Sequence, residues 1–471
     1  MDKLFKNLQN NLIAIVAALM VLGWSQTGWS QPPSSATDLE NIKVLDLQTA
    51  ARIALEDNPS LAAAQARVGQ AREAVRQARS TYWPRFDLTA SQTRVDLSDN
   101  AFASQAAIYQ AFNLDAPISN PEDYYQVGVT ASWLIFDGFT RWFNLAAAKH
   151  GEQSSAAARN DARRLLLQAV SSAFVSAQLS LENVAIAKAD EAFNQRQLTE
   201  AKLRHEVGTG ALSDVLNFEV KANSAQSDRI VAERAYETSR IGLAALLGIK
   251  SARLPEDTQL EGLEEASAAE LEMPQPDQLL EEAYNRRPDL MQNVWVVRQA
   301  EADVKAKRGS YFPTISLAAS YDGENTDDFG FESDDFGTSV GVNLSYNIFA
   351  GGLFHARHQE AKMRLREAEK GRENVKINVT SEVQTTTQRL LSAQKQLLLQ
   401  RTNARLVQKN RDLVEKEYKA GVGSLVRLNE AQRDLTAAQV RLAAAQVALR
   451  QAWYDLWSAT GQIETQLVAS E

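Results

Sequence analysis

The chain has 471 residues, of which 44% are hydrophobic and 23% are charged, and it contains 22 Gly, 11 Pro and no Cys. This composition excludes a disordered chain, a collagen-like chain and a disulfide framework. The 59 acidic residues outnumber the 50 basic ones, which argues against nucleic-acid binding. Four His and no Cys leave few groups for a metal centre. Several compact domains in a chain of this length would also need more turn residues.

The N-terminus has the pattern of a secretory signal peptide. Lys3 and Lys6 precede an apolar run over residues 12–23, which is short for a membrane-spanning helix, and small residues follow. We therefore expect residues 1–30 to be a signal peptide and residues 31–44 to be a flexible leader. An uncleaved anchor helix is the alternative.

The remaining chain repeats its landmarks in order. Residues 58–61 recur as residues 287–290, and residues 82–84 recur as residues 311–313, both with an offset of 229 positions. From residue 135 onward, the matching motifs are offset by 213 positions instead. The change in offset predicts a loop about 16 residues longer in the first half. The chain is thus a tandem duplication. Its predicted parts are a first repeat (45–248), an equatorial linker (249–277), a second repeat (278–463) and a C-terminal tail (464–471).

Each repeat is expected to run helix, β-hairpin, long helix, short helix. The first helix of the first repeat is expected over residues 61–81. The hairpins are predicted from alternation of apolar and small polar side chains over about ten residues. The four segments are residues 86–93, 126–135, 315–321 and 339–348.

Two kinds of burial suit such strands: a soluble sheet on a helix layer, or a transmembrane barrel. Aromatic residues at the strand ends and the secretory signal favour the barrel. Four strands cannot close, because outer-membrane barrels begin at about eight strands. Three copies of the chain would supply twelve strands.

The helical segments are long. Residues 152–207 and 372–420 contain neither Pro nor Gly. A helix over residues 139–206 would be roughly 100 Å long. In the last helix Leu recurs every seven residues from Leu428 to Leu456, with Ala between the leucines. This spacing predicts closely approaching helices in a coiled coil.

These features together resemble the TolC family of outer-membrane efflux and secretion channels, over residues 45–463. The motifs that carry the resemblance are the duplicated helix starts, the Tyr-aromatic-Pro motifs, the Ile-Phe-x-Gly motifs and the Gly-rich turns after Glu206 and Lys419. The resemblance implies a mainly α protomer with transmembrane β. Three protomers would form a 12-stranded outer-membrane β-barrel continuous with a long periplasmic α-helical coiled-coil barrel.

The same resemblance implies the function and the partners. The homotrimer would conduct substrate passively through the outer membrane, as the exit duct of a tripartite efflux pump or a type I secretion system. Its partners would be outer-membrane lipid, a periplasmic adaptor (membrane fusion protein) and an inner-membrane pump or ABC transporter. We expect no cofactor, no metal and no enzymatic activity, since no catalytic or nucleotide-binding motif is present.

Two Gly-rich turns should reverse the chain at the far periplasmic end. In the family such tips face the adaptor. The tip residues are Val207, Gly208, Thr209, Gly210, Ala420, Gly421, Val422 and Gly423.

The family narrows its pore with acidic residues just beyond these tips. Asp214 fits this role in the first repeat, but Arg427 stands where an acid is common, with Glu430 one turn later. This departure favours a mixed constriction closed by ion pairs. Tyr418, matched by His205, is expected to lock neighbouring coils by hydrogen bonding.

Other clusters have simpler interpretations. The acidic residues over 322–335 are expected to form a solvated outer loop, and His355 and His358 lack a third ligand for a metal. The rival functions are a trimeric coiled-coil surface adhesin or scaffold without transport activity, and an outer-membrane-anchored cell-wall hydrolase. The adhesin would carry a single terminal barrel segment, and the hydrolase would need an acid/base or metal constellation.

Overall fold

The computed structural model describes residues 42–112, 120–272, 274–326 and 329–468. The predicted signal peptide, most of the predicted leader and the last three residues lie outside the described residues. The structure differs from prediction at the end of the leader. Val44 and Leu45 form β1 (Val44–Leu45), which pairs in parallel with β4 (Gln259–Leu260) in the linker. The side chain of Leu45 is fully buried.

Two helices of equal length form the frame of the protein. α5 (Thr140–Glu206) and α9 (Leu353–Lys419) have 67 residues each, so each is about 100 Å long. The prediction of a helix over residues 139–206 is confirmed. α9 begins earlier than the Gly-free segment 372–420 indicates, because Gly371 lies inside the helix.

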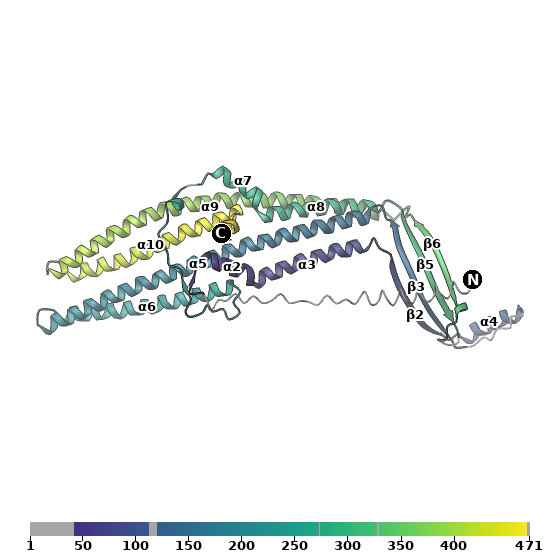
Figure 1. Cartoon of the computed structure of the whole chain (residues 1–471), viewed down its shortest axis with the longest axis horizontal. Helices are drawn as coiled ribbons and strands as arrows, with labels where there is room; N and C mark the ends of the chain where they lie inside the picture. The colour runs from purple at the N-terminus through teal and green to yellow at the C-terminus, as the bar shows by residue number, and fades with distance from the viewer. Residues whose placement is uncertain (1–41, 113–119, 273, 327–328, 469–471) are drawn as a thin grey trace. The chain divides into compact units, whose positions relative to one another are not determined.

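The shorter helices pack along these two. α6 (Leu212–Leu246) runs back along α5, and α10 (Leu425–Thr460) runs back along α9 (Figure 1). α3 (Pro59–Ser80) packs on α5, whereas α8 (Pro288–Gly309) packs on both α5 and α9. α3 confirms the predicted helix over residues 61–81, except that it ends one residue earlier.

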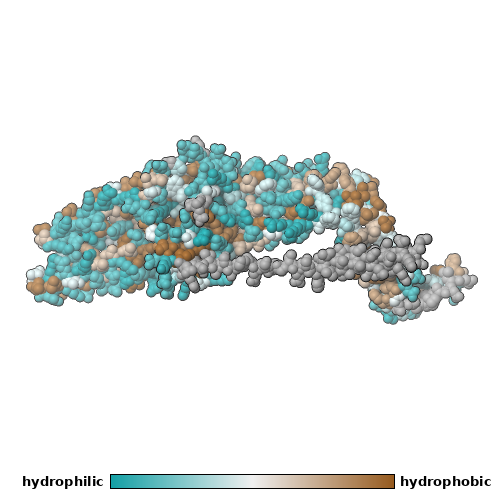
Figure 2. Space-filling model, viewed as in Figure 1, coloured by the Kyte–Doolittle hydropathy of each residue, from teal (hydrophilic) through white to brown (hydrophobic). Residues whose placement is uncertain are grey.

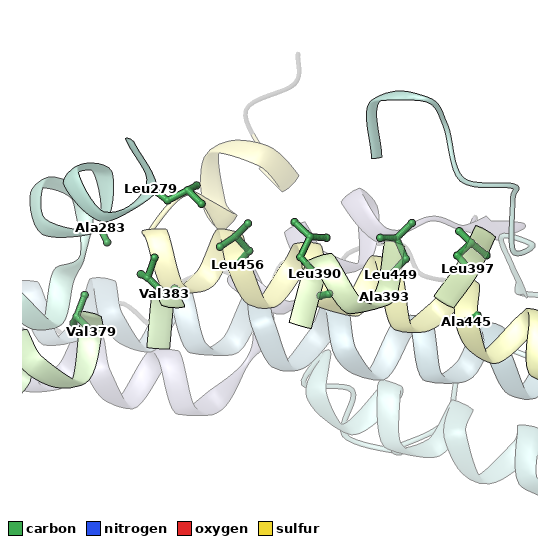
Figure 3. Packing of buried hydrophobic residues seen from close by; sticks show 12 residues of the cluster. Leu279, Ala283, Val379, Val383, Leu390, Ala393, Leu397, Ala445, Leu449 and Leu456 are labelled. Atoms are coloured by element: carbon green, nitrogen blue, oxygen red, sulfur yellow. The ribbon is translucent and has the colours of Figure 1, made fainter. Parts of the chain in front are cut away.

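The Leu/Ala heptad of α10 forms the seam that its spacing predicts. Leu428, Leu435, Leu449 and Leu456 are buried, as are the four alanines between them. Figure 3 shows Leu449 and Leu456 beside Leu390 and Leu397 of α9, with Leu279 above them. The packing therefore joins α10 to α9.

α5 contains one 18-residue segment, here called the window, that is apolar enough to cross a membrane by length and composition alone. Within the described residues it is the one helix that does so. Leu167, Val170 and Phe174 of α5 are buried, and a little under half of the window is buried within one chain. These three side chains pack within the helix bundle of one chain.

Four short helices were missed by the sequence patterns. Two of them, α2 and α7, precede the duplicated X-Pro motifs, α4 lies in the longer loop of the first repeat, and α11 occupies most of the predicted tail. Their bounds are α2 (Leu47–Asp57), α4 (Asp99–Ala111), α7 (Pro276–Arg286) and α11 (Ile463–Val468). Leu467 of α11 is buried, so this part of the tail packs against the bundle.

The linker lies across the helices and hydrogen-bonds to them. Gln178 Nε2 of α5 donates to the carbonyl oxygen of Glu261 at 2.9 Å. Gln394 Nε2 of α9 donates to the carbonyl oxygens of Glu270 and Glu272, both at 3.1 Å. These bonds satisfy linker carbonyl groups with side chains from both long helices.

The four predicted strands form one antiparallel sheet in the order β2-β3-β5-β6. Their bounds are β2 (Arg85–Val95), β3 (Glu122–Phe136), β5 (Thr314–Asn325) and β6 (Phe336–Ser345). β6 ends at Ser345, although the alternation continues to residue 348. The predicted acidic loop also begins too early, because Asp322 and Glu324 belong to β5.

Candidate functional site: the sheet face and the hairpin tips

The register of the sheet gathers its apolar side chains on one face. Leu88 lies opposite Val129, and Val129 lies opposite Tyr321 on the next strand. Leu317 likewise lies opposite Val342 of β6. Side chains of alternate residues share a face, so these pairs form an apolar surface. Leu88 and Val342 are exposed on it, which suits contact with lipid.

The opposite face carries small polar side chains. Thr89, Thr130, Ser320 and Ser339 occupy it in the four strands. Ser320 and Ser339 lie side by side, with their hydroxyl oxygens 2.9 Å apart. One face of the sheet therefore suits hydrocarbon and the other suits water.

The two hairpin tips are built by the same backbone turn. Gly208 and Gly421 have φ values of +76° and +79°, in the left-handed region that glycine adopts without strain. The amides of Thr209 and Gly210 donate to the Arg204 carbonyl oxygen at 2.9 and 3.0 Å. In the second hairpin the amides of residues 422 and 423 donate to the carbonyl oxygen of residue 417, both at 3.0 Å. The chain thus reverses in the same way at the ends of α5 and α9.

The second glycine of each turn is needed for close approach. A Cβ at Gly210 would lie 2.9 Å from the Cβ of Arg204, and one at Gly423 would lie 2.9 Å from the amide nitrogen of Tyr418. The tips present apolar side chains, since Val207 is 65% exposed and Val422 is 81% exposed. Figure 2 shows apolar atoms at the ends of both hairpins.

Behind the tips, one hydrophobic cluster joins all four helices of the two hairpins. It includes Phe193 of α5, Phe218 of α6, Val414 of α9 and Leu428 of α10. Tyr418 packs against this cluster, edge to face with Phe218 at 6.4 Å between ring centroids. The tips of the two hairpins are therefore held together within one chain.

Tyr418 also has charged neighbours. The Arg204 guanidinium lies over its ring, 5.5 Å from the centroid. Burial raises the pKa of the Tyr418 hydroxyl, and the nearby Asp214 carboxylate raises it further while Arg204 opposes the shift. Tyr418 is therefore a neutral hydroxyl at physiological pH, close to Asp214.

The structure does not bring the predicted constriction residues together within one chain. Arg427 forms its ion pair with Glu417, at 3.5 Å, and both side chains are exposed. Asp214 is partly buried in the first turn of α6. Glu430 is exposed and forms no ion pair with another described residue. His205 Nδ1 lies 3.1 Å from the Gly210 carbonyl oxygen, so within the chain it contacts its own turn.

Polar contacts between the hairpins were missed from the sequence. The Asp190 carboxylate of α5 accepts from Gln432 Nε2 at 2.7 Å and from Thr436 Oγ1 at 3.0 Å, both on α10. Asn429 Nδ2 donates to Asn217 Oδ1 at 3.0 Å. No local pattern identifies pairs more than 200 residues apart. One signal could have indicated the Asn217–Asn429 contact: the two residues follow their Gly-rich turns at nearly the same number of positions.

Among the described residues, no group of three His, Asp or Glu side chains is placed to hold a metal ion. His355 and His358 lie on α9, and the ring of His358 packs edge to face on Tyr311 at 6.1 Å.

Comparisons with known proteins agree with this arrangement. The family model described as "Outer membrane efflux protein" matches residues 50–249 and 279–462. The outer membrane efflux protein BepC of Brucella suis is 27% identical over 387 residues, covering 80% of this chain and 82% of BepC. The pyoverdine export outer membrane protein OpmQ of Pseudomonas aeruginosa is 24% identical, covering 88% of this chain and 85% of OpmQ.

Solved structures share the fold. The open-state MtrE outer membrane channel of Neisseria gonorrhoeae superposes with a TM-score of 0.71 at 23% identity, covering 88% of each chain. The structure of the outer-membrane channel OprN gives a TM-score of 0.73 at 19% identity. The predicted TolC-like fold and outer-membrane location are confirmed. The chain belongs to the outer membrane efflux protein family, the channel family that includes TolC.

Proposed function

We propose that the protein is the outer-membrane exit duct of a tripartite efflux pump or a type I secretion system. The observation that carries the proposal is a sheet with one lipid-compatible face joined directly to helices about 100 Å long. Such helices reach far from the outer membrane, toward a transporter in the inner membrane. Substrate moves passively, because the chain carries no nucleotide-binding motif and the energy comes from the inner-membrane pump.

The open sheet supports a trimer. In the described sheet, β2 and β6 each have one neighbour, so two long edges are left for pairing with other copies. Joining β6 of one copy to β2 of the next is a head-to-tail contact that closes into a ring. Three chains with four strands each give the expected twelve-stranded barrel.

The helices offer matching surfaces. Leu399, Leu406 and Leu413 lie on α9 at seven-residue spacing and are exposed within one chain. Leu212 and Leu216 form a second exposed apolar stripe at the start of α6. Stripes with coiled-coil spacing bury their side chains against a partner helix. We assign these two leucine stripes to contacts between copies of the chain.

We also propose that the tips dock on the periplasmic adaptor. Because the chain contains no Cys, a single Cys introduced by Val207→Cys or Val422→Cys provides a unique cross-linking site. Both side chains are exposed at the ends of the hairpins. Treating cells with a thiol-to-amine cross-linker should capture an adaptor, identified by mass spectrometry, together with its pump.

Met363→Cys is the matched control. Met363 is exposed on α9, near the end of that helix that adjoins the sheet, and should not capture the adaptor. Equal capture by Met363→Cys, or no capture by either tip variant in a correctly localised trimer, would contradict adaptor docking. A trimeric adhesin without transport activity would give this second result.

For the pore, we propose that three-fold repetition places Asp214, Arg427 and Glu430 of neighbouring chains around a constriction. The proposal rests on their positions just behind the tips, where α6 and α10 begin. Within each chain, Tyr418 packs behind this region, where its ring contacts the ring of Phe218 and the guanidinium of Arg204. His205 and Tyr418 remain the proposed contacts to neighbouring coils.

A further inference from the structure

A cavity of about 570 Å³ lies where α5 meets the start of α8, the end of α10 and the short helix α11. Four arginines line it: Arg159, Arg163 and Arg164 from α5 and Arg286 from the end of α7. The cavity lies far from the hairpin tips, and the proposed duct function gives these arginines no role.

Two of the four arginines are neutralised by carboxylates. Arg163 forms a two-pronged pair with Glu464 of α11. Arg164 pairs with Asp161 at 2.8 Å and donates to Ser458 Oγ at 2.9 Å. These pairs fix the wall of the cavity and leave little net charge.

The other two arginines have no carboxylate partner among the described residues. Arg159 donates only to amide oxygens, to Asn160 Oδ1 at 2.8 Å and to Gln65 Oε1 at 3.0 Å. The side chain of Arg286 is exposed and forms no hydrogen bond or ion pair with the described residues. Two of the arginines that line the cavity therefore carry charges that no described carboxylate pairs with.

The duplication makes this charge specific to one repeat. Arg286 occupies the position equivalent to Asp57, 229 residues earlier, so the first repeat has the opposite charge there. A Cβ at Gly461 would lie 3.1 Å from the backbone carbon of Arg286. This close approach brings Arg286 against the end of α10, at the edge of the cavity.

We propose that this cavity binds a small oxyanion with at least two negative charges, held between Arg159 and Arg286. Arginine presents several N–H donors in a planar fork that matches phosphate and carboxylate oxygens. Arg159 lies 19 residues beyond the start of α5, which is roughly 29 Å along the helix. The ligand is therefore a solute rather than a lipid headgroup at the sheet. By joining α5 to α7, it would tie the two repeats together.

Isothermal titration of the purified full-length protein with inorganic pyrophosphate at low ionic strength tests the proposal. We expect saturable binding of one pyrophosphate per chain, weakened at least about tenfold by Arg159→Gln or by Arg286→Gln, because each removes a charge-assisted contact. Glu464→Gln should tighten binding, since it releases Arg163 from its carboxylate. A separate titration with a tricarboxylate distinguishes phosphate from carboxylate ligands.

Arg366→Gln is the matched control, because Arg366 is exposed on α9 and the substitution removes the same charge. It should leave binding unchanged. Equal weakening by Arg366→Gln would mean general charge attraction and would overturn the proposal. So would the absence of saturable binding of either anion to the wild-type trimer. Unchanged helical content in each variant separates lost binding from lost folding.

Discussion

At the scale of single residues, Arg287 joins the start of α8 to the last turn of α10. Its guanidinium donates to Asp289, to Glu382 and, at 3.2 Å, to the Ala459 carbonyl oxygen. In the first repeat the equivalent residue is Asn58, whose Nδ2 donates at 2.7 Å to the carbonyl oxygen of Leu246. The two accepting residues are also equivalent, 213 positions apart. The duplicated motif therefore performs the same structural task with different side chains.

Replacing Arg287 should be costly. The side chain is 4% exposed, so Arg287→Ala leaves two carboxylates in a partly buried site without their cation. Loss of one partner from a buried ion pair costs about 3–5 kcal/mol. We expect a clear drop in the urea concentration at the unfolding midpoint. Arg76→Ala, at an exposed pair within α3, should change the midpoint little. Equal midpoints for the two variants would contradict this role.

His150 makes the stability of the fold depend on pH. Its ring stacks on Trp295 at 5.7 Å, and burial lowers its pKa, helped by Arg298 and opposed by Glu301. The folded state therefore binds a proton less readily than the unfolded state. The contribution of His150 to stability is complete above the pKa of the unfolded state, about 6.5. This contribution is lost as the pH falls through the lower pKa of the folded state.

His150→Phe keeps a ring beside Trp295 but removes the titrating group. Between about pH 6.5 and pH 5, the free energy of unfolding should fall more steeply in the wild type than in the variant. Urea titrations across this range measure the difference. Parallel slopes for the two proteins would show that His150 does not carry the acid sensitivity.

Arg427 should matter for the pore and little for stability. Its pair with Glu417 is long and the two side chains are 62% and 45% exposed, so the pair contributes about 0–1 kcal/mol. If Arg427 closes the constriction, Arg427→Ala should raise the closed-state conductance in planar bilayers without a large change in unfolding. Arg433→Ala, also exposed on α10, is the control. Unchanged conductance in Arg427→Ala would remove Arg427 from the constriction.

At the scale of elements, the stability of α10 comes from its buried heptad seam. Leu449 is fully buried against α9, so Leu449→Ala should cost about 2–5 kcal/mol. Leu165→Ala, at an exposed position of α5, should cost about 0.5 kcal/mol or less. Denaturation followed by helical circular dichroism measures both. Similar costs would contradict the assigned seam.

The elements that could be predicted are those with long, uninterrupted patterns. The end of α5 at Glu206 follows from the Gly-rich turn after a long segment without Gly or Pro. The seam of α10 follows from its seven-residue spacing. The short helices α2 and α7 could not be predicted in the same way. Eleven residues are marginal as an isolated helix, so these two depend on packing against α5 and α9.

Part of the candidate site was predictable from short local motifs. The Gly-rich turns identify the tips, since residues 208 and 421 adopt positive φ values in both hairpins. The contacts behind the tips, such as Asp190 with Gln432, join distant segments and leave no local signal. Within one chain Arg427 pairs with Glu417 and forms no ion pair with Asp214 among the described residues, so the proposed constriction would need contacts between neighbouring copies.

At the scale of the whole molecule, one chain leaves two kinds of surface unpaired among its described residues. Its described sheet has two free edges, and the exposed leucines of α9 have coiled-coil spacing without a partner helix. Closure by three copies would satisfy both at once, giving a barrel through the outer membrane and a helical conduit beneath it.

Ion conduction by the purified trimer in planar lipid bilayers tests the central claim most directly. Protein confirmed as a trimer by light scattering should insert and give discrete current steps of uniform size. The Tyr418→Ala variant should conduct more in the closed state, because it loses the contact with Phe218 behind the tips. A correctly folded, monodisperse trimer that inserts into the bilayer but carries no current would contradict the assignment of this protein as a duct.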